Sequence, residues 1–279
     1  MAFLIFLGTG DADGIPAIGC LCDHCKLARE NRALQRSWAS LFISDGLTNI
    51  LVDPTPALRD QFIRVGIDKD VIHAVLITHW HFEHWIGVVE LHAWDRKGLS
   101  KYSPKFEVFM NEYALSQYEK VLPALVDSTN IWLKTRYEFH VVRSYNPFKI
   151  GEIKVIPVEL DHSLPSTGFI FKLKNRYVAY LVDSGPDLSK QAVDIIKKHA
   201  DILILDNTWE KSEGSGHMDI VQAVEFVKNI KPKMAFATHI GHKNLPHDKL
   251  DKILRNKTDG VLRAAYDGLR IEFSRGEIV

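Results

Sequence analysis

The chain has 279 residues, 46% of them hydrophobic, which is enough to bury a large core in one domain or in two tightly fused halves. Lysine plus arginine and aspartate plus glutamate number 35 each, and this balance argues against a large polyanionic partner such as nucleic acid. No stretch approaches the roughly 20 apolar residues that span a bilayer, and the first residues lack signal-peptide features, so we predict a soluble, cytoplasmic protein.

Short apolar runs that end near Gly, Asp, Asn or Pro recur along the chain and predict strands. They cover residues 3–7, 40–43, 49–52, 73–77, 154–158, 167–171, 178–182, 202–205, 234–237 and 269–273. Apolar residues spaced by three and four predict helices between some of these strands. The helices cover residues 58–65, 111–125, 188–199, 219–230 and 247–254, with Asp219 at a cap position. Strand-rich halves interleaved with helices predict a layered α/β fold.

The region from about residue 94 to residue 148 fits this alternation least well. It holds a polar, aromatic-rich helix flanked by segments that contain lysine and tyrosine. We therefore predict a single domain over residues 1–279 with an insertion around 94–148, near the functional site.

The strongest chemical signal is a cluster of metal-binding side chains directly after the predicted strand 73–77. Residues 78–84 read Thr-His-Trp-His-Phe-Glu-His, a spacing that suits a loop at a strand end rather than the helical H-E-x-x-H pattern. Imidazole is the commonest neutral metal ligand, so this density predicts a site for one metal ion or two. A solvated loop with idle histidines is the alternative. The candidate ligands are His79, His81, Glu83 and His84.

Further candidate ligands follow later predicted strands. They are His162, Asp183 and His239. Residues beyond strand ends in layered α/β proteins converge on one rim, so we expect these side chains to meet the first cluster. Asp53 and Asp206 also follow strands, and we expect them to orient ligand imidazoles.

The cysteines form a second candidate site. The sequence holds only Cys20, Cys22 and Cys25, which are too close together for a disulfide framework and agree with a reducing compartment. Three thiolates and one imidazole make a closed tetrahedral zinc site. His24 is one candidate for the imidazole, although its neighbour Cys25 makes simultaneous coordination awkward. Buried or redox-active cysteines without metal are the alternative.

The motif at residues 79–84 resembles the H-x-H-x-D-H signature of the metallo-β-lactamase superfamily, and the later candidates follow in that family's order. The resemblance implies a four-layer αββα sandwich with a binuclear metal site. It implies one metal held by His79, His81 and His162, a second held by Glu83, His84 and His239, and Asp183 as the bridge.

The motif departs from the signature at one position, because Glu83 stands where the family usually has aspartate. The extra methylene moves the carboxylate by roughly a bond length, whereas metal geometry tolerates only about ±0.2 Å. Full occupancy of the second metal position is therefore an open question at this stage.

The opening Gly8-Thr9-Gly10-Asp11-Ala12-Asp13-Gly14-Ile15-Pro16, followed by the cysteines, resembles the PhnP group of phosphoribosyl cyclic phosphate phosphodiesterases, and PqqB has a related opening. In the PhnP group such cysteines hold a structural zinc with a histidine shortly after the last active-site histidine. That histidine corresponds to His242 here. His217 matches a histidine that contacts the phosphate or protonates the leaving group in related phosphodiesterases, with a surface histidine near a helix cap as the alternative.

These patterns predict a metal-dependent hydrolase, most specifically a phosphodiesterase that acts on a small phosphodiester, cyclic or linear, through a metal-bridging hydroxide. His217 and Asp183 are the expected catalytic residues. The expected cofactors are two divalent ions, zinc or manganese, and one structural zinc. We expect a small-molecule partner, no nucleic acid, no membrane and a homodimer as a possible assembly. The alternatives are RNase Z-like RNA processing, lactone or thioester hydrolysis, PqqB-like cofactor biosynthesis, or a catalytically silent metal-binding protein.

Overall fold

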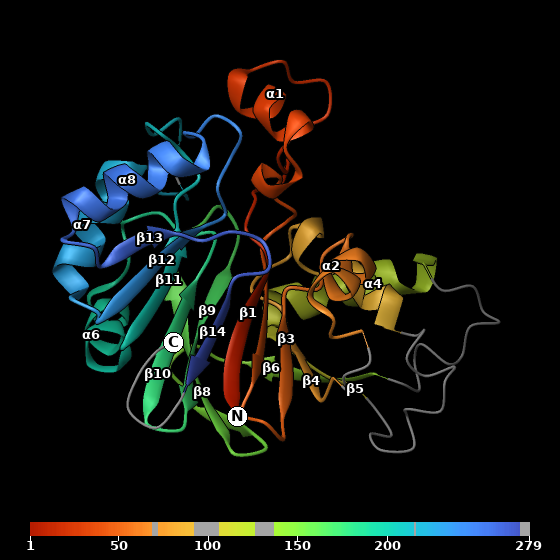
Figure 1. Ribbon diagram of the computed structural model, residues 1–279. Helices are drawn as coiled ribbons and strands as arrows, with labels where there is room; N and C mark the ends of the chain where they lie inside the picture. The colour runs from red at the N-terminus through yellow and green to blue at the C-terminus, as the bar shows by residue number, and fades with distance from the viewer. Residues whose placement is uncertain (69–71, 92–105, 126–136, 215, 274–279) are drawn as a thin grey trace.

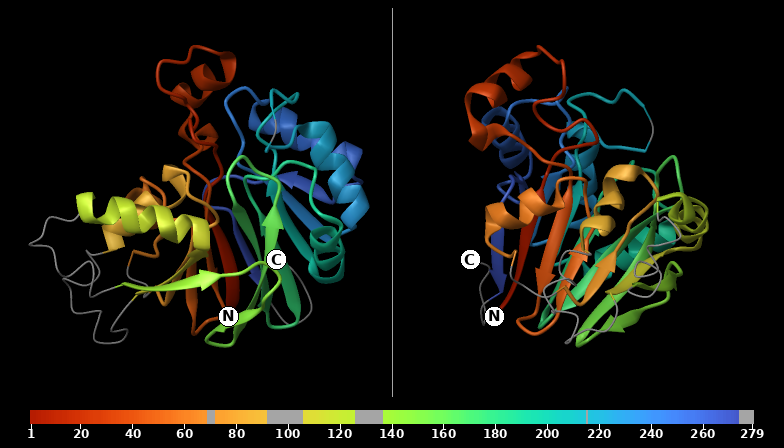
Figure 2. Two further views of the ribbon diagram at one scale, coloured as in Figure 1. Left: turned by 180° about the vertical axis from the view of Figure 1, so that it is seen from behind. Right: turned by 90° about the vertical axis from the view of Figure 1, so that its right-hand side faces the viewer.

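Two seven-stranded sheets lie face to face in the computed structural model, and helices cover the outer face of each sheet (Figure 1). The structure describes residues 1–279 except 69–71, 92–105, 126–136, 215 and 274–279. The views in Figure 2 show α2 and α4 on one side of the sheets and α6, α7 and α8 on the other. The predicted four-layer αββα sandwich is confirmed.

The first sheet has the strand order β14-β1-β2-β3-β4-β5-β6. Its strands are β1 (Ala2–Gly8), β2 (Ser40–Ser44), β3 (Asn49–Val52), β4 (Ala74–Leu76), β5 (Phe106–Asn111), β6 (Tyr137–Val142) and β14 (Arg270–Phe273). Strand β14 returns from the far end of the chain to pair antiparallel with β1, with Ala2 opposite Phe273. The helices outside this sheet are α2 (Leu58–Val65) and α4 (Glu112–Leu125).

The second sheet has the order β13-β12-β11-β10-β9-β8-β7. Its strands are β7 (Phe148–Ile150), β8 (Ile153–Leu160), β9 (Ser166–Leu173), β10 (Arg176–Leu181), β11 (Ile202–Asp206), β12 (Met234–Thr238) and β13 (Leu262–Ala264). The helices outside it are α6 (Lys190–His199), α7 (Ile220–Ile230) and α8 (His247–Lys257). None of the described helices combines the length and apolar character needed to cross a membrane.

Central strands are buried on both faces, which is why they read as continuous apolar runs. In β11, Ile202 and Ile204 pack into the core between the sheets, whereas Leu203 and Leu205 pack under the helices. A strand that is buried on both faces lacks the alternation of polar and apolar residues that marks a half-exposed strand. The same residues therefore predict a strand without revealing which face lies inside.

Helix ends follow ordinary capping chemistry. Asp219 caps α7, accepting from the backbone N–H of Gln222, whose side chain accepts in return from the backbone of Asp219. The predicted cap at Asp219 is confirmed. Helix α2 ends at Gly66, whose φ of 73° is the left-handed conformation that glycine adopts without strain.

The described part of the region 94–148, for which an insertion is predicted, is built into the first sheet, and the insertion itself stays a prediction. There, β5 and β6 extend the first sheet as parallel strands beside β4, and α4 covers them. Charged and polar residues such as Glu107 and Glu138 interrupt the apolar pattern of these strands. The rest of the predicted insertion, at residues 94–105 and 126–136, lies outside the described residues.

A buried arginine ties the loop after β1 to the C-terminal part of the chain. Arg36 donates to the hydroxyl of Thr9 and to the carbonyl of Ala265, both at 2.6 Å, and lies 3.0 Å from Nδ1 of His247. Burial lowers the pKa of His247 below its ordinary value of 6.5, and the charge of Arg36 lowers it further.

We expect the His247 contact to make stability depend on pH. Below about pH 6.5 the unfolded chain binds a proton at His247 that the folded chain does not. The free energy of unfolding therefore decreases as the pH is lowered through this window. Thermal melts of the wild type and of His247→Gln between pH 7.5 and pH 5 measure this effect. The melting temperature of the variant should fall less than that of the wild type as the pH is lowered. An equal fall in the two proteins would contradict the role given to His247.

Candidate metal centres

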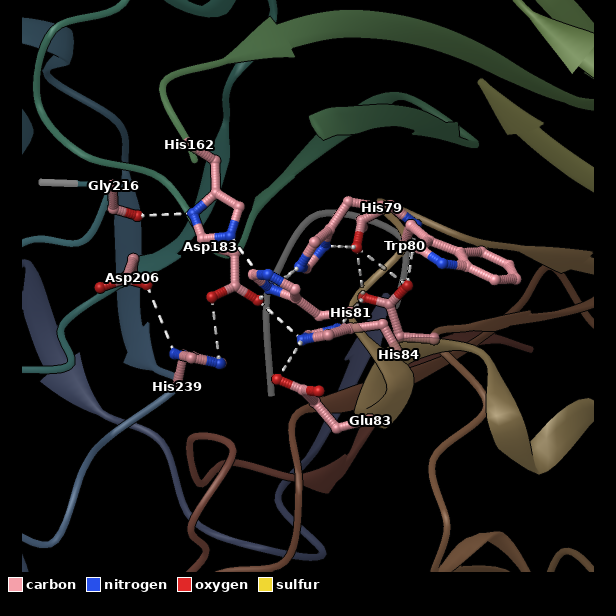
Figure 3. A network of polar contacts seen from close by, with 12 residues as sticks. His79, Trp80, His81, Glu83, His84, His162, Asp183, Asp206, Gly216 and His239 are labelled. Atoms are coloured by element: carbon pink, nitrogen blue, oxygen red, sulfur yellow. Dashed lines mark hydrogen bonds and ion pairs between the residues drawn. The ribbon is translucent and has the colours of Figure 1, made fainter. Parts of the chain in front are cut away.

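Three histidines from both sheets bring their ring nitrogens together at the rim where β4 and β8 end. Nδ1 of His81 lies 2.9 Å from Nε2 of His79 and 3.2 Å from Nε2 of His162 (Figure 3). Neutral imidazoles present one lone pair each, so three nitrogens this close cannot all pair with one another by hydrogen bonds. Their convergence fits a shared cation.

A second group forms around Asp183, which follows β10. Its Oδ2 lies 2.7 Å from Nε2 of His84 and 3.8 Å from Nε2 of His79, and its Oδ1 lies 3.2 Å from Nε2 of His239. Asp183 therefore lies between the three-histidine group and the pair formed by His84 and His239 (Figure 3).

The second group also passes a test of fit to a metal. Within the described part of the chain, Nε2 of His84, Nε2 of His239 and Oδ2 of Asp183 are buried without a well-aligned hydrogen bond, although ion-pair distances of 2.7 Å and 3.2 Å join the two histidines to Asp183. Unpaired buried polar atoms are destabilising, and a divalent ion would satisfy all three. The residues present therefore fit two metal ions that share Asp183.

Further contacts orient the candidate ligands through their other ring nitrogens. Nδ1 of His84 lies 3.0 Å from Oδ2 of Asp53, which is the contact expected of a residue that orients this ring. Nδ1 of His239 lies 2.9 Å from the hydroxyl of Thr208 and 3.5 Å from Oδ2 of Asp206. Such contacts fix the tautomer and the plane of a ligand ring.

The backbone is strained at three of these positions. Asp53, Asp183 and His239 have φ values of 55°, 56° and 55°, in the left-handed region that favours glycine. Each such conformation costs about 1–3 kcal/mol and persists only where the surroundings impose it. The strain turns the side chains toward the rim instead of along their strands.

Burial and neighbouring charges shift the pKa values of the candidate ligands. Burial lowers the pKa of His79 well below its ordinary value, so its imidazole is neutral and carries a lone pair. Burial would raise the pKa of Asp183, but His239 and His84 outweigh it and hold that pKa well below its usual range. Burial opposes protonation of His84, but Asp183 and Asp53 outweigh it and raise the pKa of that ring well above its ordinary value, so a metal ion at His84 would displace a proton.

Glu83 is buried in the turn Phe82–His84 but lies at the margin of these groups. Its Oε1 is 3.9 Å from Nε2 of His84, and it belongs to none of the close ligand clusters among the described residues (Figure 3). Six of the seven predicted active-site ligands thus lie close together, whereas Glu83 lies farther out.

Shortening Glu83 to aspartate should raise the occupancy of the metal position at His84 and His239. The carboxylate of Glu83 lies 3.9 Å from Nε2 of His84 and outside the close ligand clusters of the described residues, and aspartate would bring its carboxylate about one bond length nearer to its own backbone. We expect Glu83→Asp to bind a second cobalt ion more tightly in a titration followed by visible absorption. Equal affinities in the two proteins would show that Glu83 already serves as a full ligand.

His217 lies against the second group rather than on a remote surface. Its Nδ1 is 3.0 Å from Oδ2 of Asp206 and 3.4 Å from Oδ1 of Asp183, and its ring stacks on His239 with centroids 5.3 Å apart. Burial opposes protonation, but the hydrogen bond and charge of Asp206 outweigh it and raise the pKa of His217 to about 9. The ring is therefore protonated near neutral pH.

The cysteine site also assembles. The Sγ atoms of Cys20, Cys22 and Cys25 and a ring nitrogen of His242 lie within 4.8 Å of one another. Nδ1 of His242 is 3.3 Å from Sγ of Cys20 and 3.8 Å from Sγ of Cys22. Three sulfurs and one imidazole at these distances fit a tetrahedral zinc ion. His24 lies outside the cluster, because its Nδ1 faces the carbonyl of Asn244 at 3.1 Å.

Two orienting groups escaped the sequence analysis. The hydroxyl of Thr208 contacts Asp206, His217 and His239, and the carbonyl of Gly216 lies 3.0 Å from Nδ1 of His162. A threonine two residues after a strand and a backbone carbonyl carry no sequence signal of their own. Only the approach of the loops reveals them.

Comparisons with known proteins show which family model and which solved structures this chain resembles. The model of the beta-lactamase superfamily domain matches residues 48–240 of the chain. The crystal structure of a diphosphatase from the PhnP family superposes with a TM-score of 0.80 at 27% identity, covering 98% of each chain. Zn²⁺-bound PqqB from Methylobacterium extorquens, at 18% identity, shares the fold with a TM-score of 0.79 over 97% of this chain and 100% of that one.

Curated relatives add two partial matches. An octanoyltransferase of Porphyromonas gingivalis is 28% identical over 277 residues, which cover 95% of this chain and 50% of that protein. The coenzyme PQQ synthesis protein B of a Methylobacterium species is 33% identical over 97 residues, which cover 31% of this chain and 32% of that protein. The chain thus spans about half the length of the first relative and matches about a third of the second.

Proposed function

Because this chain belongs to the metallo-β-lactamase superfamily, we propose that it is a metal-dependent hydrolase of small phosphodiesters. The observation that carries the proposal is the position of Asp183 between two groups of histidines, with His217 beside it. The likeness to a diphosphatase of the PhnP family, at 27% identity over nearly the whole chain, supports a phosphorus ester as substrate.

Two divalent ions, zinc or manganese, would share Asp183. His79, His81 and His162 would hold one of them, and His84 and His239 would hold the other. When bound, the ions supply a Lewis acid for the phosphoryl oxygens and lower the pKa of a water molecule toward 7. Asp53 and Thr208 keep the ligand rings in the required orientation.

His217 would donate a proton to the leaving group. Asp206 holds Nδ1 of the ring, so Nε2 is left for the substrate. With a pKa of about 9 the ring carries a proton at neutral pH, and it can donate that proton to the oxygen that leaves phosphorus as the P–O bond breaks. The ring is about one-fifth exposed, as a group that meets the substrate must be.

Metal-loaded full-length protein should hydrolyse bis(p-nitrophenyl) phosphate or cyclic nucleotides faster than a lactone or a short RNA. The assay follows nitrophenolate release and the nucleotide products by chromatography. Turnover of RNA or of a lactone in preference to every small phosphodiester would reject the proposed substrate class while leaving the hydrolase assignment in place.

Elemental analysis should find about three transition-metal ions per chain, two in the histidine centre and one at the cysteines. The measurement uses protein purified without chelator. About one ion, retained after Cys22→Ser and lost after His81→Ala, would contradict both the cysteine site and the second active-site position.

Thioester hydrolysis is a second candidate, favoured by one observation. Nearly the whole chain matches half of a protein that is an octanoyltransferase, so an octanoyl thioester is a substrate worth testing. Octanoyl-coenzyme A should be cleaved in a thiol-trapping assay if this candidate is correct. Cleavage that His217→Ala leaves unchanged would place the activity outside the proposed centre.

A further inference from the structure

The three cysteines lie on an arm that packs on the body of the protein through buried residues such as His24 and Ala28. Helix α1 (Asp23–Glu30) forms this arm, which projects above the rim of the sheets (Figure 1). Cys22 is exposed and Cys20 is half-buried, whereas Cys25 is buried at the base of the helix. A small oxidant in solution therefore reaches Cys22 first.

Cys22 and Cys25 form a C-x-x-C pair at the N-terminus of that helix. Cys22 is the N-cap residue, and its Sγ accepts from the backbone N–H of Cys25 at 3.4 Å. Side chains three apart on a helix lie about 5–6 Å apart at Cβ, whereas a disulfide needs about 3.5–4.5 Å, so the N-cap segment has to move by about 1–2 Å for the bond to form.

The cysteine cluster reaches the active centre through one short loop. His242 contacts Cys20 and Cys22, and His239, only three residues earlier, contacts Asp183. Between them, Ile240 donates from its N–H to the carbonyl of Thr9 at 2.8 Å, in the segment that leads to the arm. The arm, the loop and the active-site histidine are therefore mechanically connected.

That connection matters because His239 is in a strained conformation. Its φ of 55° is imposed by its surroundings, including the hydroxyl of Thr208, which contacts both its ring and its carbonyl. A loop that loses one of its anchors can relax such a residue. Loss of the contacts at His242 would remove one of the anchors of this loop, next to those that Thr208 and Thr9 supply at His239 and Ile240.

We propose that Cys22 and Cys25 are an oxidisable dithiol, and that their conversion to a disulfide releases His242 and loosens the loop that carries His239. The sulfur of Cys22 attacks a peroxide oxygen, the O–O bond breaks, and the thiol proton passes to the departing oxygen, giving a sulfenic acid and one molecule of water. The sulfur of Cys25 then attacks that sulfur, the S–O bond breaks, and the proton of the Cys25 thiol goes to the departing hydroxyl, so that the disulfide forms with release of a second water. Two thiols are oxidised and one peroxide is reduced to two waters.

Oxidation removes two of the four groups that fit a zinc ion. A disulfide sulfur no longer carries the charge of a thiolate, so Cys20 and His242 alone remain to hold the metal. His24 and Asn244 still join the arm to the loop, at 3.1 Å, so the arm loosens without unfolding. The second active-site metal position would be the first part of the centre to weaken.

The experiment treats the zinc-loaded full-length protein with hydrogen peroxide and follows three readouts that need no turnover. Peptide mapping should find a Cys22–Cys25 disulfide, and a chromogenic chelator should detect one zinc ion released per disulfide. Amide hydrogen exchange in residues 238–245 should rise about tenfold or more. Dithiothreitol with added zinc should reverse all three changes.

Two variants separate the parts of the proposal. His242→Ala keeps every thiol, so it should form the disulfide faster and show raised exchange in 238–245 before oxidation. Cys25→Ser should give no disulfide and no further rise in exchange on oxidation. A Cys20–Cys22 disulfide, a disulfide formed with zinc retained, or unchanged exchange in 238–245 of the wild type would overturn the proposal. None of these outcomes bears on the proposed hydrolase activity.

Discussion

His217→Ala should lower kcat about 10²–10⁴-fold while the metal content stays at the wild-type value. The ring is protonated near neutral pH through its contact with Asp206, and it lies beside Asp183 and stacks on His239. Removing it takes away the proton donor and leaves every predicted metal ligand in place. Steady-state kinetics and elemental analysis of the same preparation measure both quantities.

A matched histidine gives the control for this prediction. His199 lies in the last turn of α6, where its ring packs on Tyr177, away from the centre. His199→Ala should change neither turnover nor metal content. Loss of metal together with activity in His217→Ala would instead give that histidine a structural role.

Asp183→Asn should abolish turnover and reduce the metal content from about three ions per chain to about one. Asp183 is the group between both sets of histidines, and its carboxylate offers an oxygen to each. The amide replaces one of these oxygens with a donor that faces the lone pair of a histidine. The remaining ion should be the one at the cysteines.

The control for this change lies on the same loop. Asp187 is exposed, four residues further on, and takes no part in the clusters of ligands. Asp187→Asn should keep both activity and metal. Retention of three ions in Asp183→Asn, measured on folded protein by circular dichroism and elemental analysis, would reject the shared-ligand arrangement.

Much of the fold was predictable because buried strands are recognisable in the sequence as short runs of apolar residues. The runs around β3 and β11 consist almost entirely of apolar side chains, and α2 was predicted over residues 58–65, where it lies. Strands β5 and β6 were missed because charged side chains interrupt them at the partly exposed side of the sheet. Helix α1 was missed because its sequence is mostly polar and buries little.

The types and order of the site residues were predictable, but their arrangement was not. His79, His81 and His162 meet as expected, because strand ends converge on one rim. The marginal place of Glu83 depends on side-chain torsions within a single turn, which the sequence does not encode locally. The contact of Thr208 with three site residues arises only when distant loops approach each other.

The pairing of Ala2 with Phe273 also sets the timing of folding on the ribosome. Strand β1 is synthesised well before β14, so one of its edges has no partner until β14 has emerged. An open strand edge can pair with other chains, so the nascent protein carries an aggregation hazard until β14 has been made. His239 follows β12 and is made shortly before β14, so the candidate metal centre and the first sheet are completed close together in time.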